Sequence, residues 1–146
     1  MKALVVYDSN YGNTKIVAEE VAENLGNNVR TLSVSDFDAK DMADVNLIVL
    51  GSPINGWRAT GKTIDAMAQF KEHDFDGIKF TTFDTRINKF IHGDAKDKLA
   101  VAISKMGGEL IAEPRGFFVT GREGPLTEGE LENAAGWAQQ IKSKFL

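Results

Sequence analysis

The start of the chain constrains its fold more than any other segment. An apolar run, Ala3-Leu4-Val5-Val6-Tyr7, leads through a small polar loop, residues 8–14, into a helical pattern that continues to about Leu25. A strand, a loop and a helix in this order direct backbone N–H groups, side-chain donors and the positive end of a helix dipole towards one point. This unit predicts an α/β domain with a phosphate-binding loop at its first turn.

Composition excludes several classes of function. The chain has 146 residues, a net charge of −4 and no cysteine. Its length corresponds to about one domain, residues 1–146. An acidic chain lacks the basic face that nucleic acid requires, and the absence of cysteine excludes disulfides, thiolate metal sites and cysteine nucleophiles. His73 and His92 have no metal-ligand spacing, so no metal is expected. Without a signal-peptide pattern or a membrane-length apolar run, we expect a soluble, cytoplasmic protein.

Short apolar runs alternate with helical patterns along the rest of the chain. Runs this apolar are typical of strands buried on both faces of a parallel sheet. The expected strands are Ala3–Tyr7, Val29–Val34, Leu47–Leu50, Ile78–Phe83, and a last one made of Leu110–Ile111 with Phe117–Val119. The expected helices lie near residues 15–25, 62–70, 95–106 and 131–145, with a short one at 36–42. Thr127 and Glu130 have the spacing of a capping box for the last helix.

Five strands that alternate with helices predict a doubly wound, three-layer α/β sandwich. The commonest small arrangement is a parallel sheet in the order 2-1-3-4-5, in which ligands bind beyond the carboxyl ends of the first and third strands. Three loops would meet there: residues 8–14, 51–58 and 84–93. The sequence therefore predicts one ligand site, with a phosphate loop on one side and two further loops beside it.

A second motif offers a competing interpretation. Gly56 to Thr63 satisfies the P-loop pattern of nucleotide-binding proteins. A P-loop begins where its strand ends, whereas Gly56 follows the apolar run that ends at Leu50 by several residues. This context disfavours a P-loop nucleotide-binding protein, which is kept as an alternative.

The first loop also carries a family resemblance. Ser9-Asn10-Tyr11-Gly12-Asn13-Thr14 resembles the phosphate loop of flavodoxins, whose pattern is Ser/Thr-x-Thr-Gly-Asn-Thr. The likeness continues in Leu47–Gly51, in His92-Gly93 and in Gly136-Trp137-Ala138, and the last strand lacks the extra segment of long-chain members. The chain therefore resembles a short-chain flavodoxin. Flavodoxins are themselves the standard example of a flavin bound at this switch point, so the resemblance implies noncovalently bound FMN.

The resemblance also implies which residues contact the cofactor. The phosphate is assigned to Ser9, Asn10, Tyr11, Gly12, Asn13 and Thr14. One side of the flavin ring is assigned to Ser52, Pro53, Ile54, Asn55, Gly56 and Trp57, and its other side and pyrimidine edge to Thr85, Arg86, Ile87, Asn88, Phe90, His92 and Gly93. The family commonly has an aromatic residue where this chain has Asn88, with Phe90 the nearest aromatic.

Charge near the ring departs from the family as well. In the family, the residues around the flavin ring are usually acidic, whereas this chain has the basic residues Arg58, Arg86 and Lys89 there. Positive charge favours an anionic reduced flavin, which predicts a reduction potential less negative than is usual for flavodoxins.

The function that the resemblance implies is electron transfer rather than catalysis. We expect a monomer that passes single electrons between redox proteins, such as flavodoxin reductase-like donors and their acceptors. A small NAD(P)H:quinone reductase-type flavoenzyme of the same fold is the alternative, because the missing aromatic could leave one face of the flavin open to hydride transfer.

Overall fold

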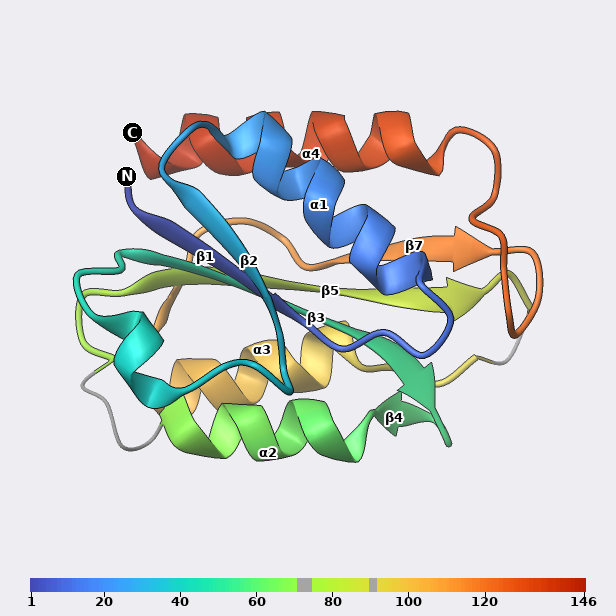
Figure 1. The fold of residues 1–146 in the computed structure, drawn as a ribbon, viewed down its shortest axis with the longest axis horizontal. Helices are drawn as coiled ribbons and strands as arrows, with labels where there is room; N and C mark the ends of the chain where they lie inside the picture. Colours follow the sequence, from blue (N-terminus) through green and yellow to red (C-terminus); the bar gives the residue numbers. More distant parts are fainter. Residues whose placement is uncertain (71–74, 90–91) are drawn as a thin grey trace.

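The protein is a parallel β-sheet with helices on both faces (Figure 1). The computed structural model describes residues 1–70, 75–89 and 92–146. Parallel strands lie in the order β2-β1-β3-β5, and β6 and β7 both pair with β5 at the far edge. Their bounds are β1 Ala3–Tyr7, β2 Val29–Ser33, β3 Leu47–Asn55, β5 Lys79–Ile87, β6 Glu109–Leu110 and β7 Arg115–Val119. The expected order 2-1-3-4-5 and the doubly wound fold are confirmed.

Side-chain alternation along the central strands explains why both faces need a cover. On β1, Leu4 and Val6 belong to one hydrophobic cluster, and Ala3 and Val5 belong to the other. Successive side chains of a strand point to opposite faces, so an unbroken apolar run buries itself only between two layers of helices. The sheet therefore lies in the middle of three layers, as the sequence predicts.

In the described ranges, two helices cover each face of the sheet. Helices α1 (Asn13–Leu25) and α4 (Glu130–Phe145) lie on one side of the sheet, and α2 (Gly61–Phe70) and α3 (Lys96–Lys105) lie on the other (Figure 1). A 3-10 turn, η1 (Ala39–Met42), precedes β3. Beneath α4, the rings of Phe83, Phe117 and Trp137 meet edge to face. The indole Nε1 of Trp137 donates to the carbonyl of Glu113 at 3.1 Å, which satisfies its only polar group.

Two strands are longer than the apolar runs predict. β3 continues to Asn55 and β5 continues to Ile87, so residues expected in loops are still paired. After Asn55 the chain turns back in a two-residue hairpin to β4 (Arg58–Ala59), which runs antiparallel to β3. The last strand is in two pieces, with residues 111–114 between β6 and β7. These extensions carry the ends of β3 and β5 to the edge where the expected ligand loops meet.

The start of α4 corrects one sequence prediction. Thr127 does not cap this helix, because its backbone N–H still pairs with the carbonyl of Phe118, as part of the chain's contact with β7. Gly129 precedes the first helical residue, with no side-chain capping bond. Glu130 is buried although glutamates stand at positions 128 and 132 beside it. Its carboxylate accepts the N–H of Phe118 at 2.6 Å.

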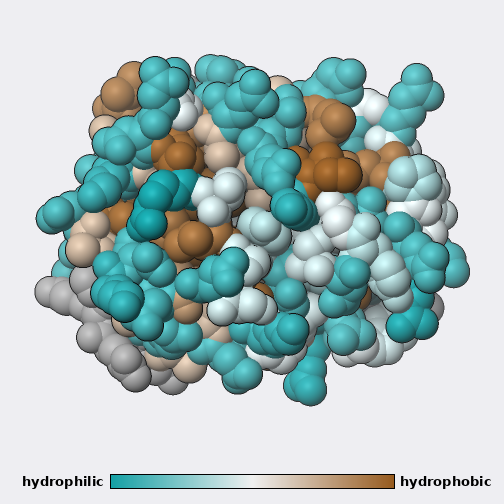
Figure 2. All heavy atoms as spheres, in the orientation of Figure 1, coloured by the Kyte–Doolittle hydropathy of each residue, from teal (hydrophilic) through white to brown (hydrophobic). Residues whose placement is uncertain are grey.

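The surface in Figure 2 is mostly hydrophilic, with apolar side chains showing between polar ones. None of the described helices is both long and apolar enough to cross a membrane. Within the described ranges, His, Asp and Glu side chains form no group that could hold a metal ion.

Candidate functional site

A cleft of about 580 Å³ opens at the carboxyl ends of the parallel strands. The first loop contributes Asn10, Tyr11 and Asn13, and the end of β3 contributes Pro53, Ile54 and Asn55. The end of β5 and the chain after it contribute Thr85, Arg86, Ile87, Lys89 and His92, and the last strand and its loop contribute Val119 and Arg122. The three loops expected from the sequence therefore do meet at one site.

Several expected residues lie beside the cleft rather than in its wall. Ser9, Gly12, Thr14, Ser52, Gly56, Trp57, Asn88 and Gly93 are not among the residues that line it. Phe90 is outside the described residues. The expected role of each of these residues in cofactor binding stays a prediction.

The first loop presents backbone donors at the start of α1. Gly12, with φ of 94°, precedes the helix and makes no side-chain cap. The hydroxyl of Ser9 accepts the N–H of Gly12 at 3.0 Å and of Lys15 at 3.3 Å. The N–H groups of Asn13 and Thr14 make no hydrogen bond to any residue in the described ranges. Free N–H groups at a helix start are suited to an anion.

Thr14 links this loop to β5. Its side chain is buried, and its hydroxyl lies 2.9 Å from the hydroxyl of Thr85. Thr85 in turn lines the cleft. This bond ties the start of α1 to the end of β5, so the two walls of the cleft are held at a set separation.

The P-loop-like segment has another conformation. Gly56 and Trp57 form the hairpin turn between β3 and β4, because Asn55 pairs with Arg58. The hydroxyl of Thr60 accepts the N–H of Thr63 at 3.2 Å and donates to Asp8 Oδ2 at 2.6 Å. The start of α2 is therefore capped by its own chain. A P-loop wraps a phosphate with consecutive backbone N–H groups, and this hairpin does not have that form.

Trp57 lies outside the cleft wall in this conformation. Its φ is 73°, and 59% of its side chain is exposed. Its backbone packs on the neighbouring loop, because its carbonyl accepts the N–H of Asp94 at 3.0 Å and Gly93 lies directly against it. The hairpin is thus fixed through the backbone of Trp57, and its ring is left at the surface.

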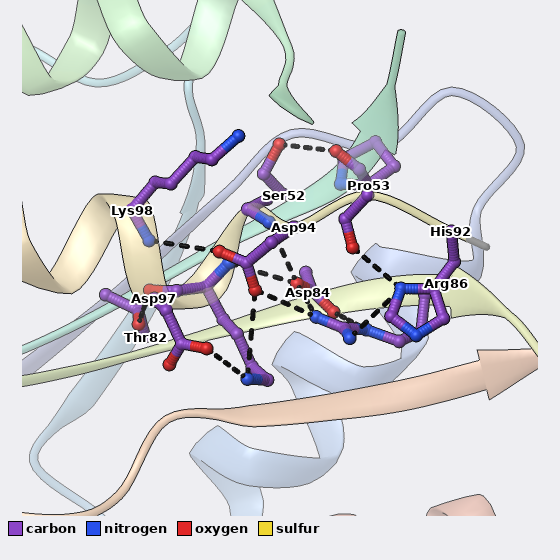
Figure 3. A network of polar contacts seen from close by, with 12 residues as sticks. Ser52, Pro53, Thr82, Asp84, Arg86, His92, Asp94, Asp97 and Lys98 are labelled. Atoms are coloured by element: carbon purple, nitrogen blue, oxygen red, sulfur yellow. Dashed lines mark hydrogen bonds and ion pairs between the residues drawn. The ribbon is translucent and has the colours of Figure 1, made fainter. Parts of the chain in front are cut away.

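A buried polar network underlies the cleft (Figure 3). Arg86 donates Nε to Asp84 Oδ1 at 2.7 Å and Nη2 to Asp84 Oδ2, and a second ion pair joins Nη2 to Asp94 Oδ1 at 3.3 Å. Nη1 lies 3.3 Å from Nδ1 of His92. Burial alone would lower the pKa of Arg86, but hydrogen bonds and charge interactions with Asp84 and Asp94 outweigh it and raise that pKa. Arg86 is thus a fixed cation whose charge is balanced inside the protein.

The remaining charge in the cleft is positive. Among the described residues that line it, Lys89 and Arg122 have no ion-pair partner in the described ranges, and none is an aspartate or glutamate. Arg58 is exposed and does not line the cleft. The expected effect of charge on a bound flavin therefore depends on Lys89 and Arg122 rather than on Arg58 or Arg86.

Sequence reasoning missed Val119 and Arg122. Val119 is the last residue of β7 and Arg122 follows that strand, whereas the switch-point rule points to the loops after the first and third strands. One signal was available, because every parallel strand of such a sheet ends at the same edge. Gly121, Gly124 and Pro125 mark a tight loop there.

The order of the sheet and the cleft at its carboxyl edge define a flavodoxin-like α/β fold. Residues 4–74 match the family model described as a flavodoxin domain. This segment, which runs from β1 through α2, therefore carries the sequence features of the flavodoxin family. No curated protein sequence shows significant similarity to it.

Solved structures share the fold over nearly the whole chain. Flavodoxin 1 of Bacillus cereus is 18% identical, with a TM-score of 0.84 and 98% of each chain covered. A flavodoxin from the domain Archaea is 21% identical, with a TM-score of 0.82, covering 99% of this chain and 98% of that one. Rubredoxin oxygen:oxidoreductase of Desulfovibrio gigas is 19% identical, with a TM-score of 0.80, covering 99% of this chain but 37% of that one. The fold thus also occurs as part of a longer oxidoreductase.

Proposed function

We propose that the protein binds FMN noncovalently in this cleft and carries electrons between redox proteins. The division of the cleft wall supports this proposal most directly. Polar donors from the first loop, Asn10, Tyr11 and Asn13, lie at one part of the wall, and apolar side chains at the strand ends form another. A volume of about 580 Å³ falls in the usual range for cofactor sites. This donor set fits a planar cofactor with a phosphate group.

The chain's own residues would hold and orient the cofactor. The N–H groups of Asn13 and Thr14 would donate to the phosphate, because they have no other partner in the described ranges. Ile54, Ile87 and Val119 would exclude water from the ring. FMN supplies the redox chemistry when bound, and the protein supplies binding, orientation and electrostatics. The expected partners are redox proteins.

The absorption spectrum of the purified protein and a titration of the flavin-free protein with FMN test this proposal. We expect flavin bands and saturable binding. In the variant Ile87→Asp, a carboxylate would stand in the apolar part of the wall assigned to the flavin ring and would lose its hydration when FMN binds, so FMN affinity should fall sharply. Ile64→Asp is the matched control, because Ile64 is exposed on α2 and does not line the cleft.

Two results would contradict the proposal. If the protein does not bind FMN, the assignment of this cofactor is wrong. If Ile87→Asp and Ile64→Asp bind FMN with equal affinity, the cofactor binds at another site. Mixing the FMN-loaded protein with NADH or NADPH separates a carrier from a flavoenzyme. A carrier should keep its flavin absorption until a reductase is added, whereas rapid bleaching by the nicotinamide alone would indicate an enzyme.

A further inference from the structure

The loop between β7 and α4 is fastened to the start of α1. The side-chain Nδ2 of Asn13 donates to the carbonyl of Glu123 at 3.2 Å. Gly124 packs so closely on the same side chain that an added Cβ would lie 2.5 Å from Asn13 Oδ1. Arg122 is next to Glu123 in this loop and lines the cleft together with Asn10 and Asn13. Arg122 thus lines the cleft from a loop that is held against the start of α1.

The charge of Arg122 is available to a ligand. Arg122 is exposed and forms no ion pair with any residue in the described part of the chain. The nearby cation Lys15 lies 3.9 Å from Glu19 on α1, and Arg86 is held by Asp84 and Asp94. Lys89, the other unpaired cation of the cleft, comes from the chain after β5 rather than from the loop fastened to α1.

The donors that the first loop offers are neutral, whereas the phosphate of FMN carries close to two negative charges at neutral pH. A guanidinium adds a charge and a planar pair of donors that matches two phosphate oxygens. We propose that Arg122 binds the phosphate group of FMN and makes the cleft select phosphorylated flavin over riboflavin. This inference rests on the proposed function and names the residue that sets the specificity of the same site.

A different role for Arg122 predicts a different result. As a solvated surface charge, Arg122 would change the affinity for FMN only slightly, since exposed charges are screened by solvent and salt. As a support for the loop, it would change the affinities for FMN and riboflavin together. A direct contact with the phosphate changes the ratio of the two affinities by a large factor.

The experiment compares FMN and riboflavin titrations of flavin-free wild type with those of Arg122→Ala, Arg122→Lys and Lys89→Ala. We expect Arg122→Ala to weaken FMN binding about 10-fold or more and riboflavin binding by less than about 2-fold. Arg122→Lys keeps the positive charge but lacks the planar pair of donors, so it should recover part of the preference for FMN over riboflavin. Lys89→Ala is the matched control, a cation of the same cleft whose loss should leave the preference for phosphate near that of wild type.

The pH of the titration provides a second readout. The second proton of a phosphate monoester leaves at about pH 6. The difference in FMN affinity between wild type and Arg122→Ala should therefore become smaller as the pH falls below that value. Thermal unfolding of each variant verifies that the fold is retained, which the exposure of Arg122 favours.

Each outcome separates this inference from the proposed function. A wild-type protein that binds neither flavin overturns both. Wild-type protein that binds the two flavins equally, or Arg122→Ala protein that keeps the wild-type ratio of affinities, overturns the role of Arg122 and leaves flavin binding intact. If Arg122→Ala weakens the affinities for FMN and riboflavin equally, Arg122 only supports the loop, and the inference is also overturned.

Discussion

Arg86 and Asp84 lie two residues apart on the same face of β5 and are joined by two parallel hydrogen bonds. Asp84 is fully buried and Arg86 is 9% exposed. The same carboxylate accepts the N–H groups of Ala95 and Lys96, at 3.2 and 3.0 Å, where α3 begins. One buried carboxylate therefore holds both a cation of the cleft wall and the start of a helix.

Replacing Arg86 by Gln should be strongly destabilising, because it leaves Asp84 charged and buried with only its backbone donors. We expect a loss of about 3 kcal/mol in the free energy of unfolding, measured by urea denaturation. Arg30→Gln is the matched control, since Arg30 is 54% exposed in its ion pair with Asp41, and it should cost less than about 1 kcal/mol. Equal losses in the two variants would contradict a special role for the buried pair.

The contribution of Arg86 should not vary with pH near neutrality. Because its pKa is raised in the folded protein, its stabilisation is complete below the pKa of the unfolded chain and is lost only as the pH rises through the folded value. Both values lie far above neutral pH. The difference between wild type and Arg86→Gln should therefore stay constant from about pH 6 to about pH 9. If this difference in stability changed within that pH range, a titratable group other than Arg86 would be responsible for the change.

Glu130 is expected to stabilise the protein although it stands in an acidic stretch. Its carboxylate accepts the N–H of Phe118 and the Nδ2 of Asn133, each at 2.6 Å. Glu130→Ala would leave the Phe118 N–H without an acceptor, at a cost of about 2 kcal/mol in urea denaturation. Glu132→Ala removes an exposed carboxylate of the same helical turn and should change stability by less than about 0.5 kcal/mol. Similar costs would argue that Glu130 acts only through its charge at the helix start.

Asp84 and Glu130 illustrate which parts of the fold the sequence predicts. The apolar runs place β1, β3 and β5, because burial on both faces leaves a signal in each strand. The order of the strands is predicted from the commonest arrangement of such a sheet. The expected fourth strand ends at Phe83, before the carboxylate of Asp84, since a buried carboxylate is tolerated only with a partner. That partner, Arg86, lies two residues further along a strand whose length depends on pairing with β3. A one-dimensional pattern does not contain this information.

The candidate site divides in the same way. The first loop is predicted because its donors adjoin a strand and a helix in sequence. Arg122 is missed because its proximity to α1 arises from a long-range contact, the bond between Asn13 and Glu123. The exposed position of the Trp57 ring is likewise set by the hairpin turn and by the packing of Gly93 on its backbone. Contacts between distant segments decide these features.

Two glycines should respond to alanine with opposite signs. Gly93 has a φ of 71°, and an added Cβ would lie 2.5 Å from Cα of Trp57, so Gly93→Ala should cost about 2 kcal/mol or more. Gly136 is exposed within α4 with nothing within 4 Å of the added Cβ. Gly136→Ala should stabilise the protein by about 0.5–1 kcal/mol. Urea denaturation of both variants tests this, and a stable Gly93→Ala protein would show that the two loops can separate.

Variants of the turn at Gly56 and Trp57 separate the effect of Trp57 on stability from its effect on FMN binding. Both residues have positive φ, 59° and 73°, as a two-residue hairpin turn of this kind requires, and glycine is favoured at the second position. Tryptophan there is strained, and its exposed ring contributes little packing in the ligand-free protein.

We therefore expect Trp57→Gly to be more stable than Trp57→Ala by about 1 kcal/mol in urea denaturation of the flavin-free protein, since both variants lack the ring and only alanine keeps the backbone strain. If the ring covers bound FMN, as the family resemblance implies, both variants should lose FMN affinity to the same extent. Equal stabilities would show that the turn changes its conformation once the ring is removed. Unchanged FMN affinity in both variants would remove Trp57 from the proposed site, because aromatic stacking on the flavin would then contribute nothing measurable.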